Sequence, residues 1–470
     1  MAEKQKPEST AVAKIEQPQA YLTPQGQNQT SEIDEFQKKT MVACKRINES
    51  YSVVQRGAQV LVMRQSLDVN NEPVISYMST KDFDTMLAHD RIWHPSEEKW
   101  IPVSKAWISW KGRNEYDGIY FRPNAAPNPR YYNLWNGFRY AEPKADTGKF
   151  DIFLDHVKTN ICRNDEKSYE WVMSWLADIF QRPERKPGTA LVLRGEMGIG
   201  KGVFANHVGY LLGKHYFTIT NSSQLTGRFN SHLAERVLIF VDESFWSGEK
   251  MGAGTLRTLV TESHIASEMK GKDVVMIESY LRLIIAANEE WVVPVGMKDE
   301  RRFTVLDAGN NCQRNYQYFS EMEKQLLNGG YEALQHYLMN YKHDANLPRT
   351  IISTNALLEQ KLHSMSPVYQ WLFDCLDNGA IAIGEETWPD GKIKTHDFYK
   401  SYLDWAQKTR QKEILSDAAL GRAMRGWLKM ERKQVWHQGW HYFIAKLKDC
   451  REQFEDKVGH SIQWGIDEQE

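Results

Sequence analysis

Continuous apolar runs that end in glycine or polar residues mark the middle of the chain. Leu191–Leu193 leads into a glycine-rich loop, and the loop opens an apolar, helix-like stretch from Val203 to Leu212. Val237–Val241 and Leu281–Ala287 are further apolar runs, each followed by a polar residue. Strands that are buried on both faces of a parallel sheet have this pattern. We therefore expect an α/β core with a parallel sheet in residues 188–312.

The pattern changes on the N-terminal side of this core. Residues 1–34 are polar, rich in Gln, Pro and Glu and nearly free of aromatics, which predicts a disordered tail. Residues 35–150 combine short alternating runs with many aromatic side chains, which predicts a small mixed domain with β content. We expect these rings to form its core rather than a platform for stacked bases. A strong amphipathic helix from Tyr169 to Gln181 lies in a helical lead-in, residues 151–187.

Helical spacing dominates the C-terminal side. Residues 313–385 are predicted to form a lid or a segment that contacts other subunits. In residues 386–470, two amphipathic helices begin at Thr395 and near Ser416, and a hairpin over Gln434–Phe443 follows them, which is a winged-helix pattern. Between Lys392 and Arg451 the chain has 14 Lys and Arg but 6 Asp and Glu. Binding of duplex DNA and assembly of subunits are both open for this basic domain.

Bulk composition narrows the class of protein. The formal net charge is −2, so the overall charge does not indicate binding of nucleic acid. A local basic channel would be enough for such binding. The five cysteines are scattered, with no C-x-x-C pair, which fits a reducing compartment and argues against a zinc module. We find neither a signal peptide nor an apolar run that could span a bilayer, and we expect a cytoplasmic protein without a membrane partner.

The glycine-rich loop reads Gly-Glu-Met-Gly-Ile-Gly-Lys-Gly and fits the spacing G-x-x-x-x-G-K. In such a loop the backbone amides and a helix N-terminus face the phosphates, and Lys201 reaches the β- and γ-phosphates. Gly202 stands where a Ser or Thr hydroxyl usually contacts Mg²⁺. The predicted nucleotide-binding residues are Gly195, Glu196, Met197, Gly198, Ile199, Gly200, Lys201 and Gly202.

Polar residues at the ends of the next two apolar runs complete a candidate hydrolytic site. Asp242 and Glu243 follow the second run, where Asp242 is suited to hold Mg²⁺ and Glu243 to orient or polarise the attacking water. Asn288 follows the third run and could hold that water or sense the γ-phosphate. Because ligands of open α/β sheets bind at the carboxyl ends of the strands, these side chains should share one edge.

Two basic features belong to the same region. Arg301 and Arg302 could stabilise transition-state charge, but only in the site of a neighbouring subunit; a surface ion pair with Asp299 or Glu300 is the alternative. Lys270 and Lys272 lie at the tip of a predicted hairpin. Several such tips around an axis could grip a phosphate backbone, and a solvated basic turn is the alternative.

Taken in order, these motifs resemble the superfamily 3 helicase domain of phage, plasmid and poxvirus primase-helicases. The resemblance covers residues 130–310 and includes Leu225–Asn230 and Asn133–Phe138. It implies an AAA+-like P-loop ATPase that assembles as a hexameric ring. This ring would move 3′ to 5′ on single-stranded or forked DNA, using ATP and Mg²⁺. No primase domain is evident, so we expect any primase, or another replication protein, to be a separate partner.

The resemblance also implies a role for each motif residue. Lys201 binds phosphate, Asp242 is linked to Mg²⁺, Glu243 is the catalytic base, Asn288 is the sensor, and Arg302 or Arg301 is the finger for the next subunit. Lys270 and Lys272 match the hairpin that tracks DNA. The function expected is a helicase for replication of a phage, satellite or plasmid. An origin-binding initiator, or an ATP-driven remodeller or loader without unwinding activity, is the alternative.

Overall fold

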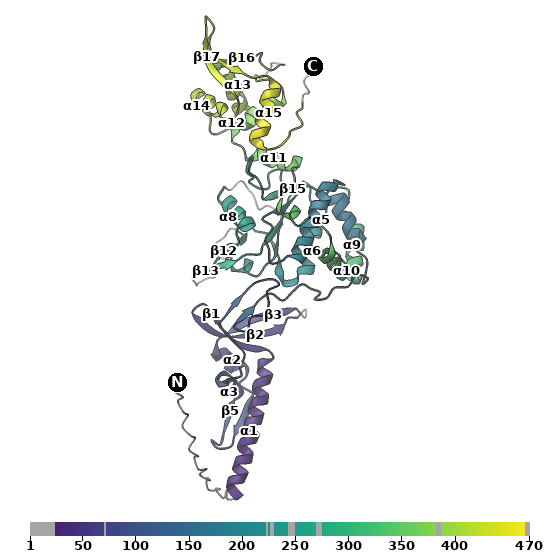
Figure 1. The fold of residues 1–470 in the computed structure, drawn as a ribbon, viewed down its shortest axis with the longest axis vertical. Helices are drawn as coiled ribbons and strands as arrows, with labels where there is room; N and C mark the ends of the chain where they lie inside the picture. The colour runs from purple at the N-terminus through teal and green to yellow at the C-terminus, as the bar shows by residue number, and fades with distance from the viewer. Residues whose placement is uncertain are drawn as a thin grey trace, which may run out of the picture. The chain divides into compact units, whose positions relative to one another are not determined.

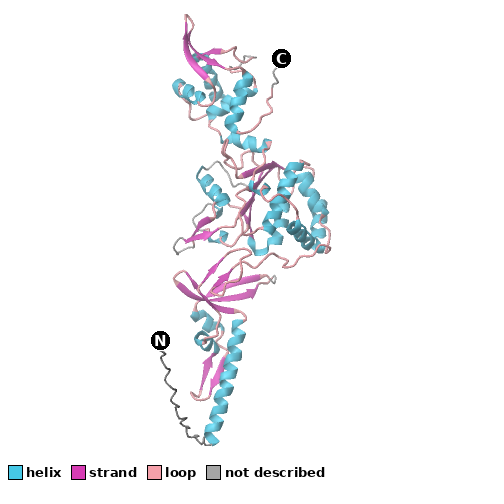
Figure 2. Ribbon diagram, viewed as in Figure 1, coloured by secondary structure: helices cyan, strands magenta, loops and turns pink. Residues whose placement is uncertain are grey.

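The computed structural model describes residues 24–69, 72–221, 224–225, 230–242, 250–268, 275–381 and 387–465 (Figure 1). The chain divides into two compact units, which we describe one at a time. Unit 1 comprises residues 1–120 and 127–134, and unit 2 comprises residues 121–126 and 135–470. Both units mix helices and strands (Figure 2).

Unit 1 contains a four-stranded sheet of order β3-β2-β1-β6 and two smaller pairs, β4–β5 and β7–β8. Helix α1 packs against α3 and β4. The elements are α1 (Pro24–Asn48), β1 (Tyr51–Arg56), β2 (Gln59–Leu67), β3 (Pro73–Met78), α2 (Thr80–Met86), β4 (Arg91–His94), β5 (Lys99–Pro102), α3 (Val103–Ser109), β6 (Glu115–Tyr116), β7 (Gly118–Tyr120) and β8 (Tyr131–Asn133).

The structure corrects two predictions in this unit. Helix α1 begins at Pro24, inside the segment 1–34 that was predicted to be a disordered tail, because Gln, Glu and Lys are good helix formers. Of the aromatic rings predicted to be core, Trp107 is fully buried, but Trp93 and Trp100 are 46% and 58% exposed. These two rings lie on the two-stranded β4–β5 pair and contact each other, with centroids 5.7 Å apart.

Unit 2 is built on a parallel sheet of five strands, in the order β10-β11-β14-β9-β15. The predicted α/β class with a parallel sheet is therefore confirmed. β14 lies between β9 and β11, so the strand that precedes the glycine loop is not adjacent to the strand that ends in Asp242. The strands are β9 (Ala190–Arg194), β10 (Tyr216–Ile219), β11 (Leu238–Asp242), β14 (Arg282–Ala287) and β15 (Phe303–Asp307).

Helices cover both faces of this sheet. Figure 1 shows α5, α6, α9 and α10 on one side, and α8 with the β12–β13 hairpin on the other. α8 packs onto the sheet through Leu256, Leu259 and Val260. The elements are α4 (Asp151–Asp155), the π-helical turn η1 (His156–Ile161), α5 (Glu166–Gln181), α6 (Lys201–Leu212), η2 (Gly213–His215), η3 (Ser231–Leu233), α8 (Lys250–Thr261), β12 (His264–Ser267), β13 (Val275–Glu278), α9 (Tyr316–Gln325), η4 (Leu326–Gly330), α10 (Tyr331–Asn340) and η5 (Leu347–Arg349).

The C-terminal part of unit 2 has its own buried cluster, which includes Trp371, Tyr402, Leu420 and Phe454. Its three-stranded sheet has the order β16-β18-β17, and the predicted helix–helix–hairpin order is present. The hairpin is longer than predicted, since β17 begins at Met430. The elements are α11 (Asn355–Ser364), α12 (Pro367–Asp377), β16 (Lys392–Lys394), α13 (Thr395–Lys408), α14 (Asp417–Arg425), β17 (Met430–Val435), β18 (Gly439–Ile444) and α15 (Leu447–Val458). In the described ranges, no helix has both the length and the apolarity to cross a membrane.

Candidate nucleotide-binding site

The glycine-rich loop connects the buried end of β9 to the start of α6, as predicted. Gly198 and Gly200 have φ of 80° and 95°, which side chains rarely adopt. A Cβ on Gly200 would also lie 2.6 Å from His156 Cε1. Gly200 is the N-cap of α6, and no side chain caps this helix end. The loop thus needs its glycines, and α6 begins without a side-chain cap at the end where such loops bind an anion.

The Lys201 ammonium lies inside this loop, and the residue is 6% exposed. Nζ donates to the carbonyl oxygens of Gly195 (2.6 Å) and Glu196 (2.8 Å) and to Asn288 Oδ1 (2.9 Å). The structure therefore brings together two predicted site residues that are 87 positions apart. Asn288 follows β14, which pairs directly with β9, so the contact results from the parallel ladder.

The acidic motif lies at the same edge of the sheet. Asp242 is the last residue of β11, pairs in register with Ala286 of β14, and is half-buried. Glu243 lies outside the described residues. Within the described ranges, no group of three or more His, Cys, Asp or Glu side chains is placed to hold a metal ion. Nucleotide-bound Mg²⁺ needs only one or two carboxylates besides phosphate and water, so Asp242 is compatible with that role.

Gly202 lacks the hydroxyl that this position usually supplies, but the structure has room for one. A Cβ at Gly202 would lie 3.7 Å from Phe240 Cε1 and 3.9 Å from Cζ, which is ordinary van der Waals contact. Its φ lies outside the left-handed region. Glycine is therefore not required at this position by packing or by backbone conformation.

Side chains of the π-helical turn η1 contact carbonyl oxygens of the glycine-rich loop, and these contacts were not predicted from the sequence. Asn160 Nδ2 donates to the Ile199 carbonyl (2.6 Å), and His156 Nε2 lies 3.3 Å from the Gly200 carbonyl oxygen. Burial lowers the pKa of His156 to about 4, so its ring is neutral at pH 7. The main-chain N–H of Arg314 donates to the Gly198 carbonyl (3.0 Å). No motif signals these contacts, because they join segments that are distant in the sequence.

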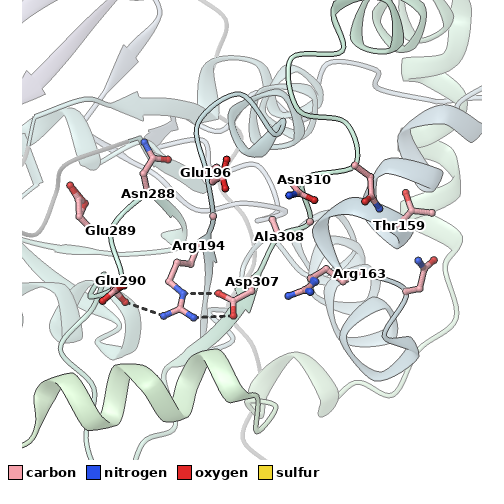
Figure 3. A pocket seen from close by; sticks show the side chains of 14 residues that line it. Thr159, Arg163, Arg194, Glu196, Asn288, Glu289, Glu290, Asp307, Ala308 and Asn310 are labelled. Atoms are coloured by element: carbon pink, nitrogen blue, oxygen red, sulfur yellow. Dashed lines mark hydrogen bonds and ion pairs between the residues drawn. The ribbon is translucent and has the colours of Figure 1, made fainter.

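A cavity of about 530 Å³ lies beside the loop, at the carboxyl ends of β9, β14 and β15 (Figure 3). Arg194, directly before the loop, forms a bidentate ion pair with Asp307 of β15, with distances of 2.6 and 2.9 Å. The cavity has a mixed polar lining of Thr159, Arg163, Asn164, Arg194, Gly195, Glu196, Asn288, Glu289, Glu290, Asp307, Ala308, Gly309, Asn310 and Asn311. Its position and polarity suit a charged ligand that continues from the loop.

Helix α11 holds the segment that follows Asn288. Gln360 Oε1 accepts the main-chain N–H groups of Val292 (2.7 Å) and Val293 (3.2 Å), and Gln360 Nε2 donates to the Glu290 carbonyl. Glu359, also on α11, forms an ion pair with Arg194 (2.5 Å). The root of the glycine loop and the segment after Asn288 are thus both bound to one helix.

The predicted arginines lie at the opposite edge of the sheet. Arg301 and Arg302 directly precede β15, whereas the loop follows β9, which is parallel to β15. Arg302 is five steps from Asp307, the register partner of Arg194 at the root of the loop, which at about 3.3 Å each is about 17 Å. The alternative was an ion pair with Asp299 or Glu300, and among the described residues neither arginine forms one. Instead, Glu300 Oε1 accepts the main-chain N–H groups of both arginines, at 3.0 and 2.8 Å. Neither arginine is brought to the loop of its own chain.

The predicted hairpin between the second and third motifs is present as the antiparallel pair β12–β13, from His264↔Glu278 to Ser267↔Val275. Lys270 and Lys272, which were predicted at its tip, lie outside the described residues. Their role as DNA contacts stays a prediction.

Comparisons with known proteins find a matching family model and similar solved structures. A family model described as a family of unknown function (DUF5906) matches residues 193–302, which include the loop, Asp242, Asn288 and both arginines. A search of curated proteins finds no match. The apo structure of the NrS-1 C-terminal region (305–718) superposes with a TM-score of 0.62 at 15% identity, covering 86% of this chain and 99% of that chain. An A-form apo structure of the same region gives 0.61 at 15% identity, covering 85% and 98%. The chain therefore shares the fold of that region.

Proposed function

We propose that this chain is an ATP-driven DNA helicase with an AAA+-like P-loop core, which works as a ring in the replication of a phage, satellite or plasmid. The observation that carries the proposal is the contact of Lys201 with Asn288 at the carboxyl edge of the sheet. From the sequence, Lys201 is predicted to bind phosphate and Asn288 is predicted to be the sensor. Their contact, next to a glycine loop that opens a helix, supports a site for a nucleoside triphosphate.

Each residue would act on a different part of the triphosphate. The first amides of α6 bind the phosphates, and Lys201 exchanges its carbonyl partners for the more strongly charged phosphate oxygens. Bound Mg²⁺, held by Asp242, phosphate and water, would neutralise charge that develops on the phosphates. Glu243 takes a proton from the water that attacks the γ-phosphorus, and the bond from that phosphorus to the bridging oxygen breaks. Asn288 holds that water in line.

The position of the arginines supports action between subunits. Arg302 lies five strand steps, about 17 Å, from the loop edge, and Arg301 lies one step further. An arginine of the next subunit would complete each site, which makes assembly a condition for hydrolysis. A hexameric ring around single-stranded DNA, with Lys270 and Lys272 facing the strand, satisfies this condition.

Strand displacement on forked DNA tests the proposal. Wild type should unwind a fork with ATP and Mg²⁺, and Lys201→Ala should not. Lys186→Ala is a matched control, because Lys186 is half-buried and also donates to a main-chain carbonyl (Glu262, 2.6 Å), but it precedes β9 whereas the loop follows it. Absence of unwinding on forks of either polarity by an assembled wild-type ring would refute the helicase.

Two further readouts separate the alternatives. ATPase activity that single-stranded DNA does not stimulate would favour a remodeller or loader. An origin-binding initiator is the second candidate, favoured by the excess of Lys and Arg between Lys392 and Arg451. Specific duplex binding that survives Lys201→Ala but is lost without residues 390–470 would favour the initiator.

A further inference from the structure

The hairpin of β17 and β18, residues 430–444, extends beyond the helices of its domain, and we call it the wing hairpin (Figure 1). Its base contributes Met430, Tyr442 and Ile444 to the domain core. From Glu431 to Trp440, all of which the structure describes, no residue is buried. The outer half of the wing hairpin is therefore not maintained by core packing.

The wing hairpin exposes large aromatic rings. Trp436, at the turn, is 84% exposed, and Trp440 and Phe443 are 46% and 36% exposed. His437 next to Trp436 has a φ of 59°, and the two rings contact each other edge to face, with centroids 4.8 Å apart. Exposed aromatic rings grouped on one element of a water-soluble fold mark a surface for a partner.

The rings are accompanied by cations. The Arg432 guanidinium lies 4.7 Å from the Trp440 ring centroid, and the Lys433 ammonium lies 5.6 Å from that of Phe443. Lys392 of β16 is the register partner of Phe443. Glu431, which pairs with Lys433, is the one carboxylate in the wing hairpin. The two pairs lie on opposite faces of the hairpin, because paired residues share a face and successive residues alternate. Each face therefore combines a flat ring with a cation, which suits a polyanion that carries rings of its own.

We propose that the wing hairpin binds single-stranded nucleic acid that crosses its tip, with an unpaired base stacked on Trp436, one neighbouring phosphate at Arg432 on one face and another at Lys433 on the other face. Stacking requires an accessible base face, which a single strand offers and the interior of a duplex does not. This contact does not require bound ATP, so it is independent of the proposed ATPase activity.

Fluorescence anisotropy of a labelled thymidine 20-mer with the full chain, without ATP, tests the proposal. One stacked base contributes about 1–3 kcal/mol, so Trp436→Ala should weaken binding by about 5- to 150-fold. Trp436→Phe should retain most of the affinity, because it keeps a stacking face. Trp100→Ala is the control, since Trp100 is also an exposed hairpin tryptophan, 58% exposed, but has the acidic Glu97 and Glu98 nearby in sequence.

Three results would overturn the proposal. The first is unchanged affinity of Trp436→Ala for the single strand. The second is an equal loss for a duplex whose ends are closed by loops, which would indicate duplex binding. The third is loss of self-assembly in light scattering while DNA affinity stays the same, which would indicate a protein contact. Failure of ATP hydrolysis in the wild type would refute the ATPase and leave the stacking contact supported by its own measurement.

Discussion

Replacing Gly202 with serine should lower the Mg²⁺ requirement of ATP hydrolysis. The change adds, at the start of α6, the hydroxyl that the loop lacks. The nearest atom to a new Cβ is Phe240 Cε1 at 3.7 Å, so the side chain fits without displacing its neighbour. One added contact of a neutral oxygen with a cation should contribute about 1.4 kcal/mol, a tenfold change in the half-saturating Mg²⁺ concentration.

Gly202→Ala separates the hydroxyl from the other effects of the change. Serine and alanine both restrict the unfolded chain and favour the helix, each by about 0.5–1 kcal/mol, which corresponds to a rise in Tm of roughly 1–4 °C. The assay is steady-state ATPase rate against free Mg²⁺ for the wild type and both variants, with thermal unfolding beside it. Identical Mg²⁺ curves for serine and alanine would refute our account of the metal site. A lower Tm in both would refute the packing argument.

Three other predictions follow from the contacts of the loop and its surroundings. Mixing Arg302→Ala with Lys201→Ala subunits should restore part of the ATPase activity, because some interfaces then combine an intact loop with an intact arginine; no recovery at any ratio would contradict action in trans. Asn160→Ala should lower the free energy of unfolding in urea by about 1–3 kcal/mol and raise KM for ATP, because it leaves the Ile199 carbonyl without its 2.6 Å hydrogen bond. Burial lowers the pKa of His156 and His207 to about 4, so the unfolded chain binds protons first as pH falls from 6.5, and each should cost about 2 kcal/mol of stability between pH 7 and 5. Equal free energies of unfolding at the two pH values would contradict that assignment.

The strands that could be predicted are those with continuous apolar runs. Leu191–Leu193, Val237–Val241 and Leu281–Ala287 correspond to β9, β11 and β14 within one or two residues. β10 and β15 were not predicted. β10 is half-buried at three of its four positions, so it is not a continuously buried strand. β15 directly follows Arg301 and Arg302, and this segment was interpreted for its arginines rather than as a strand.

The same contrast holds for the candidate site. The contact of Lys201 with Asn288 could be anticipated, because parallel strands bring their carboxyl ends to one edge. The support from His156 and Asn160 could not, because it depends on a π-helical turn that no local pattern announces. The Arg194–Asp307 ion pair needs the register of β9 on β15, which is fixed only in three dimensions.

Helix α11 gives the sheet edge a mechanical connection to the C-terminal domain. Gln360 makes three hydrogen bonds to the segment after Asn288, and Glu359 is paired with Arg194 at the root of the loop. A shift of Asn288 towards or away from a phosphate must either break these bonds or carry α11 with it. α12 begins at Pro367, two residues after Met365, the C-cap of α11, so only a short link joins the two helices. We therefore expect a displacement at the sheet edge to be transmitted through α11 to the domain that follows.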